Sequence, residues 1–134
     1  MIALLLDTNL LVDEPDMSLL GEPEDEITLC TAALSYAEFQ DGEFSTDPVV
    51  AATFMLKQAD VKQSLGDGIP FGEAELVAYR AICAAVVASG RQLNRARRMD
   101  LMIAATALAN GMTLATRNID DFAGLEQVVP VVQL

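Results

Sequence analysis

Two short apolar segments stand out in the pattern of hydrophobic and polar positions. Residues 2–6 form a continuous apolar run, and residues 112–116 are short, apolar and rich in strand-forming side chains. Such runs are typical of parallel strands that are buried on both faces. The first run ends in Asp7, Thr8 and Asn9, and the second ends in a polar turn. Because ligands bind at the carboxyl ends of the strands in open α/β sheets, we expect these two polar segments to meet at one place.

The rest of the chain alternates between helical and extended patterns. Residues 27–31 predict another strand, and residues 127–134 predict an edge strand because Pro130 cannot donate to a central ladder. Helices are expected at residues 32–39, 47–65, 73–89 and 100–110. Residues 10–26 are expected to hold a short helix and a loop, and residues 69–71 a very short strand or a connector. This alternation predicts a single α/β domain, residues 1–134, with a parallel sheet covered on both faces.

The bulk composition fits a folded domain that associates with other molecules. Hydrophobic residues make up 52% of the 134 residues, which favours a protein partner or a dimer over a monomer. The formal net charge is −12, and no Lys or Arg precedes Lys57. Net charge therefore opposes nucleic-acid binding, so a role on RNA or DNA must depend on a local basic patch and metal ions. The acidic first half suits a basic partner peptide.

The sequence shows no sign of secretion or membrane insertion. Cys30 and Cys83 occur singly in apolar contexts, which suits buried thiols in a reducing cytoplasm. No segment has the layout of a signal peptide or the roughly 20 apolar residues that span a bilayer. We therefore expect a soluble, cytoplasmic protein.

Three acidic residues lie in apolar surroundings at the edges of predicted elements. Asp7 follows the first strand, Glu38 lies in an early helical turn, and Asp100 lies between Met99 and Leu101. A carboxylate near a core is unfavourable unless it is paired or bound to a cation. The chain contains no histidine, and no lysine is near these acids, so the available ligands are hard oxygens. Such ligands select Mg²⁺ or Mn²⁺ and do not suit zinc.

Each acid also has a structural explanation that involves no ligand. Asp7 fits a turn after a strand. Glu38 stands three residues after Ser35, which matches a helix capping box. Asp100 fits the N-cap or the first turn of its helix, where the macrodipole favours an acid. Each explanation is reasonable alone, but the three together are less convincing than a shared site.

Four ordered motifs carry a resemblance to a known family. They are an apolar run followed by Asp7-Thr-Asn, a Ser35-x-x-Glu38-Phe helix after the second strand, Asp100-Leu-Met-Ile-Ala-Ala-Thr-Ala, and Thr116-Arg-Asn-x-x-Asp121-Phe. Together they resemble the PIN-domain ribonucleases, specifically the VapC-type toxins of type II toxin–antitoxin pairs. The resemblance covers essentially the whole chain, and the ordered set is far more specific than any single motif.

This resemblance implies a three-layer α/β/α sandwich with a central parallel sheet and the activity of a Mg²⁺- or Mn²⁺-dependent endoribonuclease. It carries over Asp7, Glu38 and Asp100 as catalytic residues and metal ligands. The polar residues at the strand ends are expected to shape the pocket: Thr8, Asn9, Thr116 and Asn118. The resemblance also implies a homodimeric toxin and an antitoxin partner that blocks the active site, commonly with a basic side chain in the acidic pocket.

One position departs from the family pattern. Many members have a fourth acid two residues after the Thr, whereas this chain has Asn118. The nearest acids are Asp120 and Asp121, which are most simply loop residues. Asp121 is the candidate for reaching a second metal ion or acting through water. The choice between one and two metal ions therefore stays open.

The candidate contacts for RNA phosphates are basic residues near the expected groove: Arg95, Arg97, Arg98 and Arg117. They would offset the negative net charge locally. A solvated basic face is the more common role of such a cluster.

Other classes of protein with acidic pockets fit the sequence less well. An aspartate-based phosphatase of the haloacid dehalogenase type needs a second Asp two positions after the nucleophilic one, where this chain has Asn9. A receiver-like signalling domain needs a Lys beyond a late strand, but Lys57 and Lys62 both lie within a predicted helix. A catalytically inactive PIN-like binding module is a third alternative, against which the three intact acids argue.

Overall fold

A four-stranded parallel sheet forms the centre of the fold. The computed structural model describes residues 2–134, and its strands pair in the order β2-β1-β3-β4, every pair parallel. The strands are β1 Ile2–Leu6, β2 Ile27–Thr31, β3 Thr113–Thr116 and β4 Val131–Gln133. Leu6, the last residue of β1, pairs with Thr31 of β2 and with Ala115 of β3. The carboxyl ends of these three strands therefore lie side by side at one edge of the sheet.

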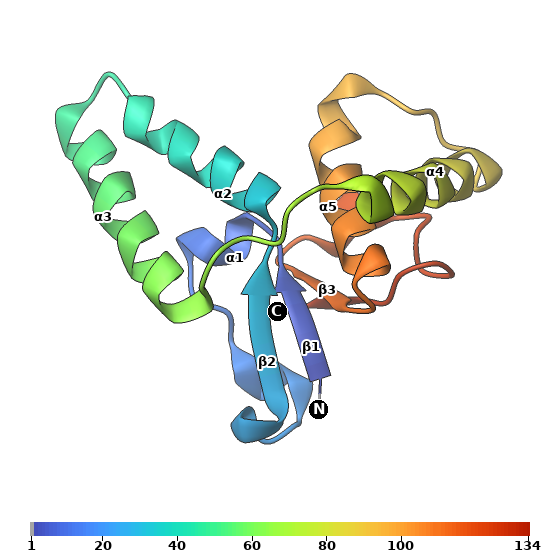
Figure 1. The fold of residues 1–134 in the computed structure, drawn as a ribbon, viewed down its shortest axis with the longest axis horizontal. Helices are drawn as coiled ribbons and strands as arrows, with labels where there is room; N and C mark the ends of the chain where they lie inside the picture. Colours follow the sequence, from blue (N-terminus) through green and yellow to red (C-terminus); the bar gives the residue numbers. More distant parts are fainter. Residues whose placement is uncertain (1) are drawn as a thin grey trace.

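Helices connect the strands (Figure 1). The α-helices are α1 Asn9–Val12, α2 Ala33–Gln40, α3 Pro48–Leu65, α4 Glu73–Ala88 and α5 Arg98–Ala109, and the 3₁₀ helices are η1 Met17–Leu20, η2 Glu24–Glu26, η3 Asp41–Phe44, η4 Arg95–Arg97 and η5 Ile119–Phe122. Among residues 2–134, no helix has both the length and the apolar character needed to cross a membrane.

Side chains alternate between the two faces of the sheet, and helices cover both faces. On one face, Leu5 and Leu114 pack in a buried cluster with residues of α4 and α5 such as Ile82. On the other face, Leu6 packs with Tyr36 of α2 and with residues of α1 and α3. Figure 1 shows the same division, with α4 and α5 together on one side and α2 and α3 on the other. The predicted three-layer α/β/α arrangement is confirmed.

The longest helix, α3, contributes little to the core. Its start follows the prediction, because the Asp47 side chain accepts a hydrogen bond from the Val49 amide at 2.9 Å and Pro48 occupies the first helical position. No residue of α3 is fully buried. Phe54 contacts Phe39 of α2, with ring centroids 5.2 Å apart. Helices α2 and α3 thus form an arm beside the sheet.

Two segments refine the sequence-based boundaries. Within residues 69–71 only Ile69 pairs with the sheet region, through an isolated parallel bridge to Ala32. The next residue is Pro70, which has no amide hydrogen and cannot extend the pairing. The predicted tail strand is confirmed as an edge strand, but β4 begins only after Pro130.

Gly111 reverses the chain between α5 and β3. Its φ of 65° lies in the left-handed region, which glycine adopts without strain. Because of this reversal, the first turn of α5 lies at the edge of the sheet where β3 ends. The fold therefore brings Asp100 and Thr116 to the same edge, although 16 positions separate them in the sequence.

Replacing a fully buried side chain of β1 tests this packing. Leu5 is 0% exposed, so Leu5→Ala leaves a cavity between the sheet and the helices and should lower the free energy of unfolding by about 2–5 kcal/mol. Leu19→Ala is the matched control, because Leu19 is 62% exposed and should lose less than about 0.5 kcal/mol. Urea unfolding followed by circular dichroism measures both values. Equal losses would contradict the assignment of Leu5 to the core.

Candidate functional site

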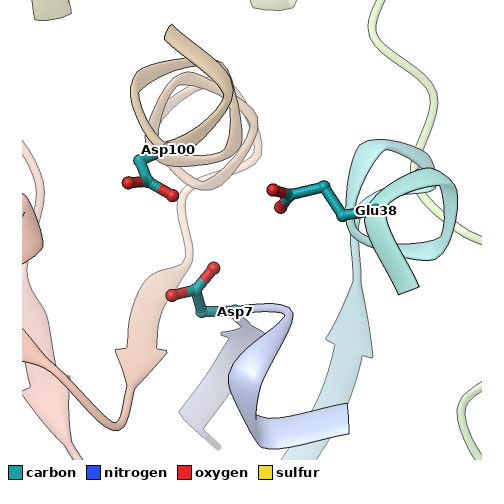
Figure 2. Close-up of side chains that lie close together, drawn as sticks. All are labelled: Asp7, Glu38 and Asp100. Atoms are coloured by element: carbon teal, nitrogen blue, oxygen red, sulfur yellow. The ribbon is translucent and has the colours of Figure 1, made fainter. Parts of the chain in front are cut away.

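Three carboxylates meet at the carboxyl edge of the sheet (Figure 2). Asp7 directly follows β1, Glu38 lies in α2 after β2, and Asp100 lies in the first turn of α5. One carboxylate oxygen of each residue lies within 4.8 Å of the corresponding oxygens of the other two. We refer to these three residues as the carboxylate cluster. The structure thus brings together the three acids that the sequence singled out.

Asp7 is the most enclosed member of the cluster, with 4% exposure. Its Oδ1 accepts a hydrogen bond from the Thr8 amide at 2.8 Å, and its Oδ2 accepts one from the Thr116 hydroxyl at 2.9 Å. Its own amide donates to the Ala115 carbonyl at 2.8 Å, which extends the pairing of β1 with β3 by one residue. The Asp7 carbonyl also accepts from the Leu10 amide at 3.0 Å, so Asp7 begins a turn after β1 while its buried carboxylate is held in a fixed orientation.

Glu38 is held from the opposite side of the cluster. The Thr8 hydroxyl donates a hydrogen bond of 2.6 Å to its Oε1. The capping-box explanation is wrong, because α2 has Ala32 as its N-cap and Ser35 lies inside the helix. The Ser35 hydroxyl is buried and has no hydrogen-bond partner among the described residues. The Glu38 carboxylate therefore points to the cluster (Figure 2).

Burial and mutual repulsion disfavour ionisation of the cluster. The pKa of Asp100 is raised from 3.8 to about 6, chiefly by burial and then by the negative charges of Asp7, Asp121 and Glu38, while the Arg97 guanidinium acts in the opposite direction. Burial also raises the pKa of Asp7, against the two hydrogen bonds that favour its charged form. The site thus concentrates negative charge that a bound cation would stabilise.

Thr116 connects the ends of β1 and β3. Its hydroxyl donates to Asp7 and lies 3.2 Å from the Asn118 amide and 3.4 Å from Asn9 Nδ2, from which it accepts. The Asn9 side-chain oxygen Oδ1 in turn accepts from the backbone amide of Arg117 at 3.2 Å. Together with Thr8, these polar residues border the carboxylate cluster. The structure therefore brings the four predicted pocket-shaping residues to one place.

The two acids of η5 differ in their position. Asp121 is partly buried, and its Oδ1 accepts a hydrogen bond of 3.2 Å from Asn118 Nδ2. Its charge acts on both Asp7 and Asp100, so it lies next to the cluster. Asp120 is exposed. Of the two acids, Asp121 is therefore the one placed beside the site.

The four arginines named as candidate phosphate contacts also differ. Arg95 and Arg98 are exposed. The Arg97 guanidinium donates to the carbonyl of Asp121, and that of Arg117 donates to the carbonyl of Asp13 at 3.2 Å. Sequence reasoning missed these two contacts because a backbone carbonyl leaves no residue-specific signal. Arg97 does stand one helical turn before Asp100, which is the only sequence cue to its position.

The donor set of the site fits a small divalent cation. All available ligands are carboxylate oxygens, and the chain has no histidine. Oxygens that bind one Mg²⁺ at about 2.1 Å lie about 3 Å apart when adjacent and about 4.2 Å apart when opposite, so the three carboxylates, whose oxygens lie within 4.8 Å of one another, could share one ion after adjustment of their side chains. Asp7, Glu38 and Asp100 are the residues that would hold the ion.

Comparison with known proteins places the fold. No protein-family model and no curated protein sequence matches the chain. Solved structures do match it over its length. VapBC-5 of Mycobacterium tuberculosis, a member of the VapBC family of toxin–antitoxin systems, is similar at 22% identity, covers 100% of both chains and has a TM-score of 0.81. VapBC2 of Rickettsia felis, bound to a DNA fragment of its promoter, has 22% identity, 100% and 99% coverage and a TM-score of 0.76.

A third solved structure agrees with these two. FitAcB of Neisseria gonorrhoeae has 23% identity, covers 97% of this chain and 96% of its own, and has a TM-score of 0.73. At such identities the similarity establishes the fold. The expectation of a PIN-like α/β fold from the VapC resemblance is therefore confirmed.

The raised pKa of Asp100 predicts that its removal stabilises the metal-free protein in a pH-dependent way. Because this pKa is higher in the folded chain than its usual 3.8, folding is favoured while Asp100 is protonated, and that contribution is lost as the pH rises through about 6. Asp100→Asn cannot ionise, so it should raise the free energy of unfolding at pH 8 by about 1–2 kcal/mol after allowance for solvent screening. The gain should fall by about half at pH 5.

Urea unfolding in chelator at both pH values measures this difference. Asp25→Asn, which removes an exposed acid of η2 at the other end of the sheet, is the matched control for net charge. An equal gain for Asp100→Asn at pH 5 and pH 8 would mean that the substitution acts through packing and not through ionisation.

Proposed function

We propose that this chain is a Mg²⁺- or Mn²⁺-dependent endoribonuclease that hydrolyses RNA phosphodiester bonds and acts as the toxin of a toxin–antitoxin pair. The observation that carries the proposal is the convergence of Asp7, Glu38 and Asp100 at the carboxyl edge of a fold shared with VapBC and FitAB structures. A carboxylate cluster of this kind fits phosphodiester hydrolysis because both the metal and the substrate are recognised through charge.

The proposed roles follow from how each carboxylate is held. A bound divalent ion supplies a nucleophile at neutral pH by lowering the pKa of water, and it stabilises charge on the leaving oxygen. Asp7 is oriented by two hydrogen bonds and Glu38 by the Thr8 hydroxyl, so both present fixed oxygens to the cation. Asp100 completes the set from the start of α5. None of the three needs to act as a general base.

The surrounding polar residues have supporting roles in this proposal. Asn118 stands where many members have a fourth acid and donates to the Asp121 carboxylate, and we propose that this carboxylate serves a second ion or an ordered water. In this proposal, the exposed Arg95 and Arg98, which lie just before Asp100, contact RNA phosphates near the cluster. Arg117 donates to the carbonyl of Asp13, the C-cap of α1, and has further donors for phosphate.

An RNA cleavage assay tests the proposed activity. The purified chain should cleave total RNA with Mg²⁺ or Mn²⁺ and not with chelator. Asp7→Asn and Asp100→Asn should each lose about 100-fold or more of the rate, because each removes a ligand charge without changing side-chain size. Asp25→Asn is the control for one lost acid outside the site and should keep wild-type activity. Circular dichroism confirms that each variant is folded.

The outcomes of this assay separate the alternatives. Cleavage that persists in the Asp7→Asn variant would remove Asp7 from the mechanism. Absence of cleavage by the wild type with either metal, while calorimetry detects metal binding that Asp100→Asn abolishes, would instead favour a catalytically inactive PIN-like binding module.

The proposed partners are an antitoxin protein and a second copy of the chain. VapBC-5 belongs to a family of toxin–antitoxin systems. Here, several large apolar side chains of η3 and α3 are exposed, among them Phe44 at 79%, Val49 at 74% and Leu56 at 70%. Exposed apolar side chains in a sequence with a net charge of −12 fit a partner segment that combines apolar and basic residues.

Co-expression tests the antitoxin. The chain should co-purify with the small protein encoded by the neighbouring gene, and that protein should suppress RNA cleavage in proportion to its amount. Light scattering should give the mass of a dimer for the isolated chain. Full RNA cleavage by the stoichiometric complex would contradict the inhibitory role of the partner.

A further inference from the structure

Arg97 links the start of α5 to the loop that carries Asp121. We propose that Arg97 is a positioning residue, which holds η5 so that the Asp121 carboxylate faces the carboxylate cluster. The proposal rests on the proposed ribonuclease function, and it gives Arg97 a role different from that of a phosphate contact. Its basis is the set of contacts that the side chain makes.

The first observation is the contact between the two segments. Arg97 is the last residue of η4 and stands three residues before Asp100. Its side chain is partly buried, and its guanidinium donates to the carbonyl of Asp121, 24 residues further along the chain. This hydrogen bond joins the segments that precede α5 and follow β3. A charged donor makes it stronger than a neutral hydrogen bond.

The second observation concerns the polar contacts between η5 and the site, because the buried Phe122 anchors the end of η5 in the core but does not orient the Asp121 carboxylate. Asn118 Nδ2 donates to the Asp121 carboxylate, the Asp121 amide donates to the Asn118 carbonyl, and the Asn118 amide donates to Thr116, each at 3.2 Å. Hydrogen bonds of this length are at the long end of the normal range. Through Thr116 they lead to Asp7. Between η5 and Thr116 the chain of hydrogen bonds is long at each step, so the Arg97 contact adds a second connection that holds the backbone at Asp121.

The third observation is electrostatic. The negative charge of Asp121 acts on both Asp7 and Asp100, so repulsion tends to push η5 away from the cluster. The positive charge of Arg97 lowers the pKa of Asp100, and the same guanidinium donates a hydrogen bond to the backbone carbonyl of Asp121. Arg97 is thus placed to oppose this repulsion from within the site. Arg95, two residues earlier in η4, is exposed and carries the same charge. It is therefore the matched residue for comparison with Arg97.

Steady-state kinetics separates positioning from phosphate binding. Arg97→Gln should lower kcat by about 10-fold or more with KM within about 2-fold, since the loop shifts while RNA still binds. Arg95→Gln loses the same charge beside the site and should instead raise KM with little change in kcat. A rise in KM alone for Arg97→Gln would overturn the proposal and make Arg97 a phosphate contact.

A double-mutant cycle tests whether Arg97 acts through Asp121. Asp121→Asn keeps the backbone carbonyl that Arg97 contacts and removes the carboxylate. If Arg97 acts by placing that carboxylate, Arg97→Gln should lower kcat by less than about 2-fold in the Asp121→Asn background. Equal losses in both backgrounds, or wild-type kcat for Asp121→Asn, would overturn the proposal.

Hydrogen exchange gives a readout that needs no activity. The amides of Asp121 and Ala123 are hydrogen-bonded within η5, to Asn118 and Asp120. Both should exchange faster in Arg97→Gln and at the wild-type rate in Arg95→Gln. If the wild type cleaves no RNA, the proposed function fails while this measurement still decides whether Arg97 holds the loop. Unchanged exchange at both amides in Arg97→Gln would overturn the proposal.

Discussion

Negative charge confined to a small volume is the constraint on which this structure depends. Three carboxylates lie within 4.8 Å of one another, and a fourth, Asp121, lies beside them. Such an arrangement is unfavourable without a cation, so it persists only if the rest of the fold holds it. Apolar packing on both faces of the sheet supplies that stability. The strand order β2-β1-β3 then brings the three carboxylates together, because each comes from a segment joined to one of these adjacent strands.

The groups that orient the carboxylates are largely neutral. Thr8 donates its amide to Asp7 and its hydroxyl to Glu38, and the Thr116 hydroxyl donates to Asp7. A lysine at either threonine position would also donate hydrogen bonds, but it would cancel the negative charge that attracts a metal ion. Threonine fixes the direction of an oxygen and leaves its charge intact. The positive charge of Arg97 acts at the margin, through the start of α5 and the loop after β3.

Much of the fold and the cluster could be predicted because the relevant signals are local. A continuous apolar run predicts a buried strand wherever its partners lie, and the position of Asp7 at the end of such a run predicts an edge location. Other features depend on contacts between distant residues. The spacing of Ser35 and Glu38 fits a capping box equally well, and only the Thr8 hydroxyl, 30 residues from Glu38, shows that Glu38 belongs to the site. The contact between Arg97 and the Asp121 carbonyl also joins distant residues, so the sequence pattern does not predict it.

The long-range hydrogen bond between Thr116 and Asp7 has a consequence for synthesis of the chain. These residues are 109 positions apart, and β1 has its place between β2 and β3. When β1 and α2 have emerged from the ribosome, the nascent chain already contains Asp7 and Glu38. It still lacks α5, which carries Asp100, and β3, whose Thr116 orients Asp7. The complete pocket can therefore form only after nearly all of the described chain has emerged. Under the proposed function, the complete carboxylate cluster is therefore absent while most of the chain is still being synthesised.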